Sequence, residues 1–262
     1  MKNRILTLCM VLGMVGLLVG CSKLTKMNDE YYKCSIQTEQ ETVTDIINDK
    51  EVNLFTKDVQ NIVFEEKEEL NNLIEILDTM LNGYAEFCDD FKDSCRENYE
   101  YVEHITEEGD ETIPFFTSRK VEQVENTKDL VSIKFEVSGY WGGAHGFSYI
   151  DTVNYSPELG REIEIEDVID TTQDDWKDKL TEVVFNICEN RTVLDEPISY
   201  FENYKNDLAT AFDSNYFYLT KDAIVFVYGE YGITPYSEGI QEVEVPFSEI
   251  QDLVTPAYKI VK

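Results

Sequence analysis

The longest pattern in the chain is a run of apolar residues that recur at steps of three and four between residues 59 and 84. This spacing is typical of one face of an amphipathic α-helix and predicts a helix from about residue 56 to beyond residue 82. Asn82-Gly83 offers a place for it to end, although helical spacing resumes toward His104. The acidic side chains within residues 65–69 would form its solvated face. The apolar set is Val59, Ile62, Val63, Leu70, Leu73, Ile74, Leu77, Leu81 and Tyr84.

From residue 131 the period of the pattern changes to two. Apolar residues at 131, 133, 135 and 137 alternate with polar ones, which is typical of a half-buried strand. Residues 147–155 are expected to be its hairpin partner. After the turn at residues 157–160, Ile163 and Ile165 indicate another short strand.

The remaining pattern completes the fold class. Residues 176–187 have the spacing of a second amphipathic helix, and residues 216–219 and 223–228 form a predicted hairpin around Lys221-Asp222. Residues 241–247 are expected to be the final strand. Helix, strands, helix, strands predicts an α+β fold, with a mainly antiparallel sheet covered by a long N-terminal amphipathic helix and a second helix.

The first twenty residues have the features of an export signal. Lys2 and Arg4 precede an uncharged, apolar run over residues 5–20, which is short for a spanning helix of about 20 apolar residues. The run ends in Leu-Val-Gly-Cys at residues 18–21, which resembles the lipobox of bacterial lipoproteins. The resemblance implies cleavage before Cys21, lipidation of Cys21 and attachment to the outer side of the cell membrane. An uncleaved N-terminal anchor is the alternative.

These features divide the chain into a signal over residues 1–20, a lipidated polar tether over 21–30 and a folded domain over 31–262. Cleavage would remove Lys2 and Arg4 and no acid, taking the formal net charge from −31 to −33. So negative a field excludes nucleic acid as a partner and favours cationic proteins. The same charge could also serve only to keep an exported domain soluble.

Four cysteines remain after Cys9 and Cys21 are set aside, an even number that makes disulfides plausible in an exported protein. Cys88 and Cys95 would stand about 10 Å apart on one continuous helix, too far for the roughly 4.4–6.8 Å that a disulfide requires. The capping residues between them would support a break in the helix. We therefore expect a local Cys88–Cys95 bridge across a broken helix, with Cys34 and Cys188 paired together or reduced. Pairs of Cys88 with Cys188 or of Cys95 with Cys34 are the alternatives.

The sequence also argues against a zinc site, because it has no CxxC motif and only two histidines, and no cofactor is expected.

The stretch YWGGAHGFSY, residues 140–149, joins the two predicted strands. The pair Gly142-Gly143 suits a hairpin turn, in particular a primed turn, because such turns require positive φ. His145 has no accompanying nucleophile motif, so a hydrogen-bonded structural histidine is favoured over a catalytic base. Tyr140 and Trp141 would lie in the core or, at a turn, point outward as contact residues.

Two segments resemble a known family. SIKFEVSGYWGGAHGFSYIDTVNY followed by LGREIEIEDVI, and FYLTKDAIVFVYGEYGITPYSEGIQEVEVPFSEI near the C-terminus, are similar to the RsiV-like extracellular domain family. This domain occurs in lysozyme-sensing anti-sigma factors, beside a deacetylase module, and in many lipoproteins of unassigned role. The resemblance covers about residues 56–253. The matched positions are Tyr140, Gly142, Gly143, Ala144, His145, Gly146, Tyr231, Pro235, Tyr236 and Gly239.

The resemblance implies a binding module and not an enzyme. It implies capture of lysozyme or another cationic wall-active protein, which agrees with the negative charge of the chain. The candidate ligand contacts are Tyr140, Trp141, Gly142, Gly143, His145, Tyr231, Pro235 and Tyr236. The alternative function is binding of peptidoglycan, with Trp141 and the tyrosines of YGEYGITPY stacking on sugars. A pair of carboxylates at a suitable separation does not indicate a hydrolase active site here, because a chain with 53 acidic residues is almost certain to contain such a pair.

Overall fold

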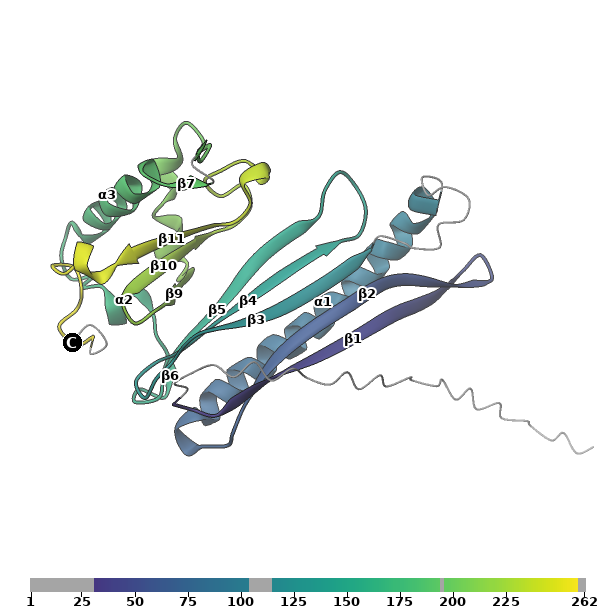
Figure 1. Ribbon diagram of the computed structural model, residues 1–262, viewed down its shortest axis with the longest axis horizontal. Helices are drawn as coiled ribbons and strands as arrows, with labels where there is room; N and C mark the ends of the chain where they lie inside the picture. Colours follow the sequence, from purple (N-terminus) through teal and green to yellow (C-terminus); the bar gives the residue numbers. More distant parts are fainter. Residues whose placement is uncertain (1–30, 104–114, 194–195, 259–262) are drawn as a thin grey trace, which may run out of the picture.

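The computed structural model describes residues 31–103, 115–193 and 196–258, and it confirms the α+β class (Figure 1). The larger part is a six-stranded sheet in the order β1-β2-β3-β4-β5-β6. All neighbouring strands are antiparallel except β2 and β3, which are parallel. The strands are β1 (Cys34–Ile47), β2 (Lys50–Phe64), β3 (Phe116–Asn126), β4 (Val131–Tyr140), β5 (Phe147–Ser156) and β6 (Arg161–Glu162).

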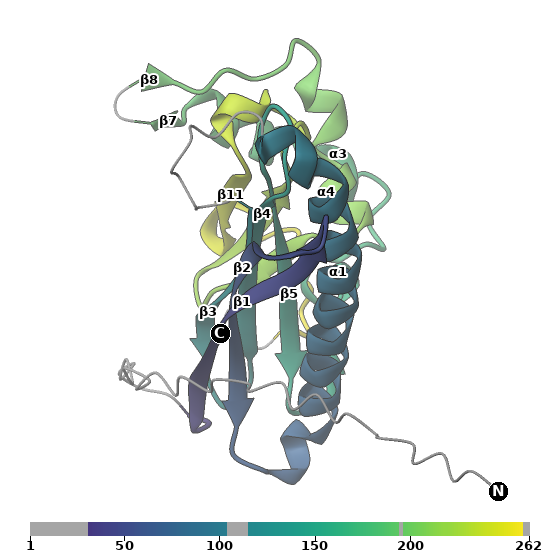
Figure 2. The ribbon, with the colours of Figure 1, turned by 90° about the vertical axis from the view of Figure 1, so that its right-hand side faces the viewer.

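The long helix α1 (Asn71–Glu103) connects the two parallel strands, because a parallel pair cannot be joined by a tight turn. A short 3-10 turn, η1 (Glu68–Leu70), leads into it. The helix crosses one face of the sheet (Figures 1 and 2), and Leu73 and Leu77 pack there against Ile133 and Phe135. The apolar alternation along β4 therefore faces α1, and the polar positions of β4 face the opposite side.

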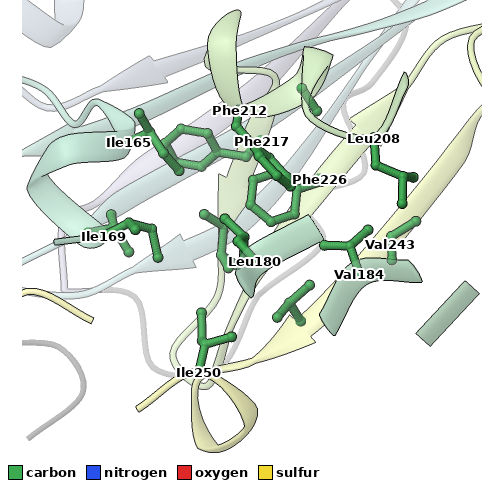
Figure 3. Close-up of a cluster of buried hydrophobic side chains, with 14 of the residues drawn as sticks. Ile165, Ile169, Leu180, Val184, Leu208, Phe212, Phe217, Phe226, Val243 and Ile250 are labelled. Atoms are coloured by element: carbon green, nitrogen blue, oxygen red, sulfur yellow. The ribbon is translucent and has the colours of Figure 1, made fainter. Parts of the chain in front are cut away.

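The second part is a three-stranded antiparallel sheet with its own core. Its order is β11-β10-β9, and α3 (Trp176–Glu189) packs on β11. Figure 3 shows Leu180 and Val184 of α3 directed toward Phe226 and Val243 of the sheet. The strands are β9 (Phe217–Leu219), β10 (Ala223–Tyr228) and β11 (Gln241–Pro246). The smaller elements are α2 (Ile165–Val168), α4 (Thr210–Asp213), the pair β7 (Thr192–Val193) and β8 (Glu196–Pro197), and the 3-10 turns η2 (Tyr204–Asp207), η3 (Tyr236–Glu238) and η4 (Phe247–Glu249).

Polar contacts join the two parts on the face of the large sheet that points away from α1. Asn154 Nδ2 donates to the carbonyl of Phe217 over 2.8 Å, and its Oδ1 accepts from the amide of Leu219 over 2.9 Å. Ser132 Oγ donates to the same Asn154 oxygen over 2.9 Å. Because these groups are buried, each requires its partner, and the contacts fix how the small sheet sits on the large one.

Two predicted elements have different bounds in the structure. The helix predicted from about residue 56 to beyond residue 82 is wrong in its first part, since residues 56–64 belong to β2 and the helix begins only at Asn71. It also continues through Asn82-Gly83 to Glu103, and the acidic residues of 65–69 are exposed in the link before it. Ile163 and Ile165 do not form a strand: the short strand is β6, and Ile165 begins α2. The second helix, the 131–140 strand, its partner and the C-terminal strands are confirmed.

The expected Cys88–Cys95 bridge is wrong because α1 does not break. Both residues lie on one continuous helix, and each packs in a different apolar cluster. Cys88, Cys95 and Cys188 are free thiols, so the pairs of Cys88 with Cys188, Cys95 with Cys34, and Cys34 with Cys188 are not formed either. Cys34 Sγ lies 4.0 Å from Asn126 Nδ2.

The lipobox, Cys21 and the tether lie outside the described residues, as does His104. Among the helices that the structure describes, none has the length and apolar character needed to cross a membrane.

Candidate functional site

Two loops that lie far apart in the sequence meet at one end of the molecule. The first, residues 141–146, connects β4 to β5, and the second, residues 229–240, connects β10 to β11. The ring of His145 stacks on the ring of Tyr236 with centroids 4.0 Å apart, and Tyr236 Oη donates to the carbonyl of Gly146 over 3.2 Å. Tyr231 Oη lies 3.3 Å from His145 Nε2. Both segments of the RsiV-like resemblance therefore contribute to one site.

Glycines allow the first loop to follow this path. Gly142 and Gly143 have φ values of +113° and +94°, as expected for a turn, but the loop has six residues and is not a two-residue primed turn. A Cβ atom on Gly142 would lie 3.1 Å from the Cβ of Asn98 on α1. A Cβ on Gly146 would lie 2.6 Å from the carbonyl oxygen of Gly139, so the backbone itself excludes a side chain there.

Tyr140 and Trp141 do not point freely outward. The ring of Trp141 lies 4.8 Å from that of Phe147 and 5.8 Å from that of Phe91 on α1, and Trp141 is half-buried. Tyr140 Oη donates to the carbonyl of Gly143 over 3.0 Å and so ties the loop to its own start. We assign both side chains mainly to the packing and shape of the loop.

His145, Tyr231 and Tyr236 form the outward-facing part, which we call the aromatic rim. Tyr231 is 55% exposed and has a φ of +62°, a left-handed conformation that is unfavourable for a residue with a bulky side chain. The loop can hold it there because Ile233 and Thr234, two and three residues later, are fully buried. Pro235 precedes Tyr236 at the start of η3, and Gly239 ends that turn with a φ of +68°.

The hydrogen bonds of His145 define its tautomer. Its Nδ1 lies 2.8 Å from the carbonyl oxygen of Gly146, which can only accept, so Nδ1 carries the proton. In the neutral ring, Nε2 is then the acceptor for the hydroxyl of Tyr231. The ring is thus a bridge between the two loops. Among the described residues, no carboxylate contacts it in the way that would orient a catalytic base.

A groove opens beside the aromatic rim, with a volume of about 500 Å³. Its floor is the face of β3, β4 and β5 that points away from α1, and its wall is the loop 229–240. Ser148 Oγ donates to Glu230 Oε1 over 2.6 Å across the junction of floor and wall. No lysine or arginine is among the lining residues, which are Phe116, Glu136, Ser138, Gly139, Tyr140, Gly146, Phe147, Ser148, Glu230 and Tyr236.

The groove residues Phe116, Glu136, Ser148 and Glu230 were not predicted from the sequence. Glu136 had a usable signal, because it occupies a polar position of the alternating strand just before the glycine-rich loop. Phe116 and Glu230 had none, since their meeting depends on how the small sheet docks on the large one.

The structural neighbours and one family model agree on the fold. Residues 166–248 match DUF3298, a protein family of unknown function. The DUF3298 match covers less than half of the chain and includes the loop 229–240 but not the loop 141–146. It is compatible with the RsiV-like resemblance, although it does not carry that name. No match was found among curated proteins.

Two solved DUF3298 structures resemble almost the whole chain. One, from Bacteroides fragilis, has a TM-score of 0.58 at 17% identity and covers 88% of this chain and 98% of that one. The other, from Pseudomonas aeruginosa, has a TM-score of 0.57 at 17% identity, with 88% and 97% covered. At this identity the likeness concerns the fold alone.

Proposed function

We propose that this protein is a non-enzymatic binding module that captures a cationic protein, lysozyme or another wall-active protein, at the aromatic rim and the groove beside it. The observation that carries the proposal is the meeting of the two resemblance segments around a groove that holds two carboxylates and no basic side chain. Aromatic side chains on a rigid, anchored loop are typical contact residues in protein interfaces.

Electrostatics supports a cationic partner. The formal net charge of −31 attracts basic proteins over long range and accelerates their association. Glu136 and Glu230 concentrate part of that charge in the groove, where partial burial of Glu230 limits screening by water. Binding should therefore weaken steeply as ionic strength passes the physiological value, where the Debye length is about 8 Å.

Peptidoglycan binding is the second candidate, and the exposure of Tyr231 favours it. Its ring, 55% exposed beside Tyr236, offers a surface on which a sugar could stack. Trp141 is less suited to that role than the sequence suggested, because Phe91 and Phe147 cover it.

The test compares both ligands with one pair of tyrosine variants. Tyr231→Ala should weaken lysozyme binding about tenfold or more, as expected for an aromatic interface anchor. Tyr216→Ala is the matched control, because Tyr216 is equally exposed, at 54%, outside both loops. Binding to lysozyme and retention on purified peptidoglycan are measured in parallel at low and physiological salt. Peptidoglycan retention that depends on Tyr231, without lysozyme binding at low salt, would establish the second function instead.

The same proposal places the module at the cell surface through a lipidated Cys21. The lipobox at residues 18–21 supports this. Cys21→Ala should abolish lipid labelling and leave an unprocessed precursor. Unchanged processing and membrane attachment of that variant would rule out the lipoprotein assignment.

A further inference from the structure

Glu136 lies on the floor of the groove and Glu230 on its wall. Glu136 is exposed on β4, and its carboxylate forms no hydrogen bond or ion pair within the described part of the chain. Glu230 accepts one hydrogen bond, from Ser148, through Oε1. Lys120 lies opposite Glu136 in the β3–β4 register, yet the two form no ion pair in that part of the chain.

Two other carboxylates behave differently. Glu122 on β3 and Glu242 on β11 of the small sheet both contact the ammonium of Lys134, at 2.9 and 3.0 Å. The groove carboxylates are thus set apart from acids whose charge is already balanced. Their arrangement offers two acceptors to a cation that comes from outside the chain.

The strand register brings these acceptors close together. Ser138 lies directly opposite Ser148, and Glu136 is two residues along the same strand, which makes it the diagonal neighbour of Ser148. Diagonal neighbours on one sheet face lie about 7–8 Å apart. Because Glu230 is hydrogen-bonded to Ser148, one cationic side chain can reach both carboxylates.

Aromatic rings complete the surroundings. Phe116 is 41% exposed on the groove floor, and Tyr236 lines the wall. A guanidinium group stacks on aromatic faces while its planar fork donates to carboxylates, whereas an ammonium is a compact, strongly hydrated charge with three donors. The protein uses the stacking part of this geometry internally, since the guanidinium carbon of Arg119 lies 3.9 Å from the ring centroid of Phe135 while Nη1 donates to the carbonyl of Gln60.

We propose that the groove is an anchoring subsite for an arginine side chain of the partner, with its guanidinium held between Glu136 and Glu230 and stacked on Phe116 or Tyr236. The inference rests on the proposed function, since it names the chemical group by which a cationic protein is recognised. It predicts that the groove discriminates arginine from lysine at equal charge.

The test uses the full chain and two acetylated, amidated heptapeptides of equal charge, Gly-Arg-Gly-Arg-Gly-Arg-Gly and its lysine counterpart, titrated by calorimetry. The arginine peptide should bind about tenfold more tightly. The double variant Glu136→Gln/Glu230→Gln should bring the two affinities to within about twofold of each other. The control Glu75→Gln/Glu86→Gln removes the same charge from exposed positions on α1, on the other face of the sheet, and should keep the preference.

Equal affinity for the two peptides, no binding of either, or a preference that survives in the groove variant would overturn the subsite. Lysozyme binding is measured with the same three proteins, the full chain and the two double variants. Arginine preference without lysozyme binding would contradict the capture of lysozyme and leave the subsite standing, and lysozyme binding without arginine preference would do the reverse.

Discussion

The ring of His145 stacks on the ring of Tyr236 with centroids 4.0 Å apart and planes inclined by 30°, and this pair joins the two parts of the molecule at the candidate site. Each ring comes from a loop that connects two strands of a different sheet. The stack, the Tyr236–Gly146 hydrogen bond and the Tyr231–His145 contact hold the two loops in one arrangement. A partner that binds the aromatic rim thus meets a preorganised surface, which lowers the entropic cost of binding.

Substitution of Tyr236 should therefore affect stability as well as binding. Tyr236→Ala removes the stack and the hydrogen bond to Gly146, and the free energy of unfolding should fall by about 1 kcal/mol. Tyr236→Phe keeps the stack and should lose less than half of that amount. Urea denaturation measures both. Equal losses in the two variants would show that the hydroxyl and not the ring contact stabilises the loops.

Two glycines that both have open space beside them differ in backbone conformation, and the first of them tests the continuity of α1. Gly83 lies in the middle of the helix, and a Cβ there would meet nothing within 4 Å, so Gly83→Ala should stabilise the protein by roughly 0.5–1 kcal/mol. Gly143 has the same open space but a φ of +94°, so Gly143→Ala should destabilise it by about 1 kcal/mol. Thermal or chemical denaturation gives both values. A helix that ended at Gly83 would reverse the first sign.

The strands that follow a simple pattern could be predicted from the sequence, and those that do not were missed. In β4 every second residue is buried against α1, so its period is plain. In β2 the buried residues Val59 and Ile62 are three apart; the ladder to β3 ends at Val59, and the Gln60 side chain and carbonyl then bond with β3. That spacing matches a helical step, and it merged with the true helix pattern that begins at Leu70.

The site was predictable only where it is local. The glycine-rich loop and the Tyr231–Tyr236 segment stood out by composition, and the structure brings them together. Glu230 and Phe116 meet through tertiary packing of two separate sheets, which no local pattern encodes. For Trp141 the sequence left both a core and an outward position open, because the turn alone does not reveal the packing partner that the nearby face of α1 offers through Phe91.

The free thiols give a pH-dependent stability. Burial raises the pKa of the Cys95 thiol to about 12, and it also raises the pKa of Cys88 and Cys188. An unfolded thiol has a pKa of about 8.5, so above that pH the unfolded state releases protons that the folded state retains. Stability is therefore present in full below about pH 8.5 and is lost as the pH rises toward 12.

For Cys95 this loss should amount to about 1 kcal/mol between pH 7.5 and 9.5. The Cys95→Ala variant should have a lower free energy of unfolding at pH 7.5, because the substitution leaves a cavity. It should, however, lose less stability between the two pH values. Urea denaturation with reductant at the two pH values measures the difference. The same decline in both proteins would contradict a protonated, buried Cys95.

Lys134 should be the main charged link between the two sheets. Its ammonium contacts Glu122 of β3 and Glu242 of β11, and its side chain is only 12% exposed. Lys134→Met keeps the length of the side chain but leaves Glu242, at 32% exposure, without its partner. The free energy of unfolding should fall by about 1–2 kcal/mol. Lys128→Met is the matched control, because Lys128 is 70% exposed and its pair with Asp129 is long, at 3.8 Å, so its loss should be within about 0.5 kcal/mol.

Adding Glu242→Gln to Lys134→Met should cost less than Glu242→Gln alone, because the charge of Glu242 is already unpaired in the Lys134→Met variant. If the two single-variant losses in the free energy of unfolding simply add in the double variant, Lys134 and Glu242 do not interact in solution. The Ser132 and Asn154 contacts would then hold the sheets together without this ion pair.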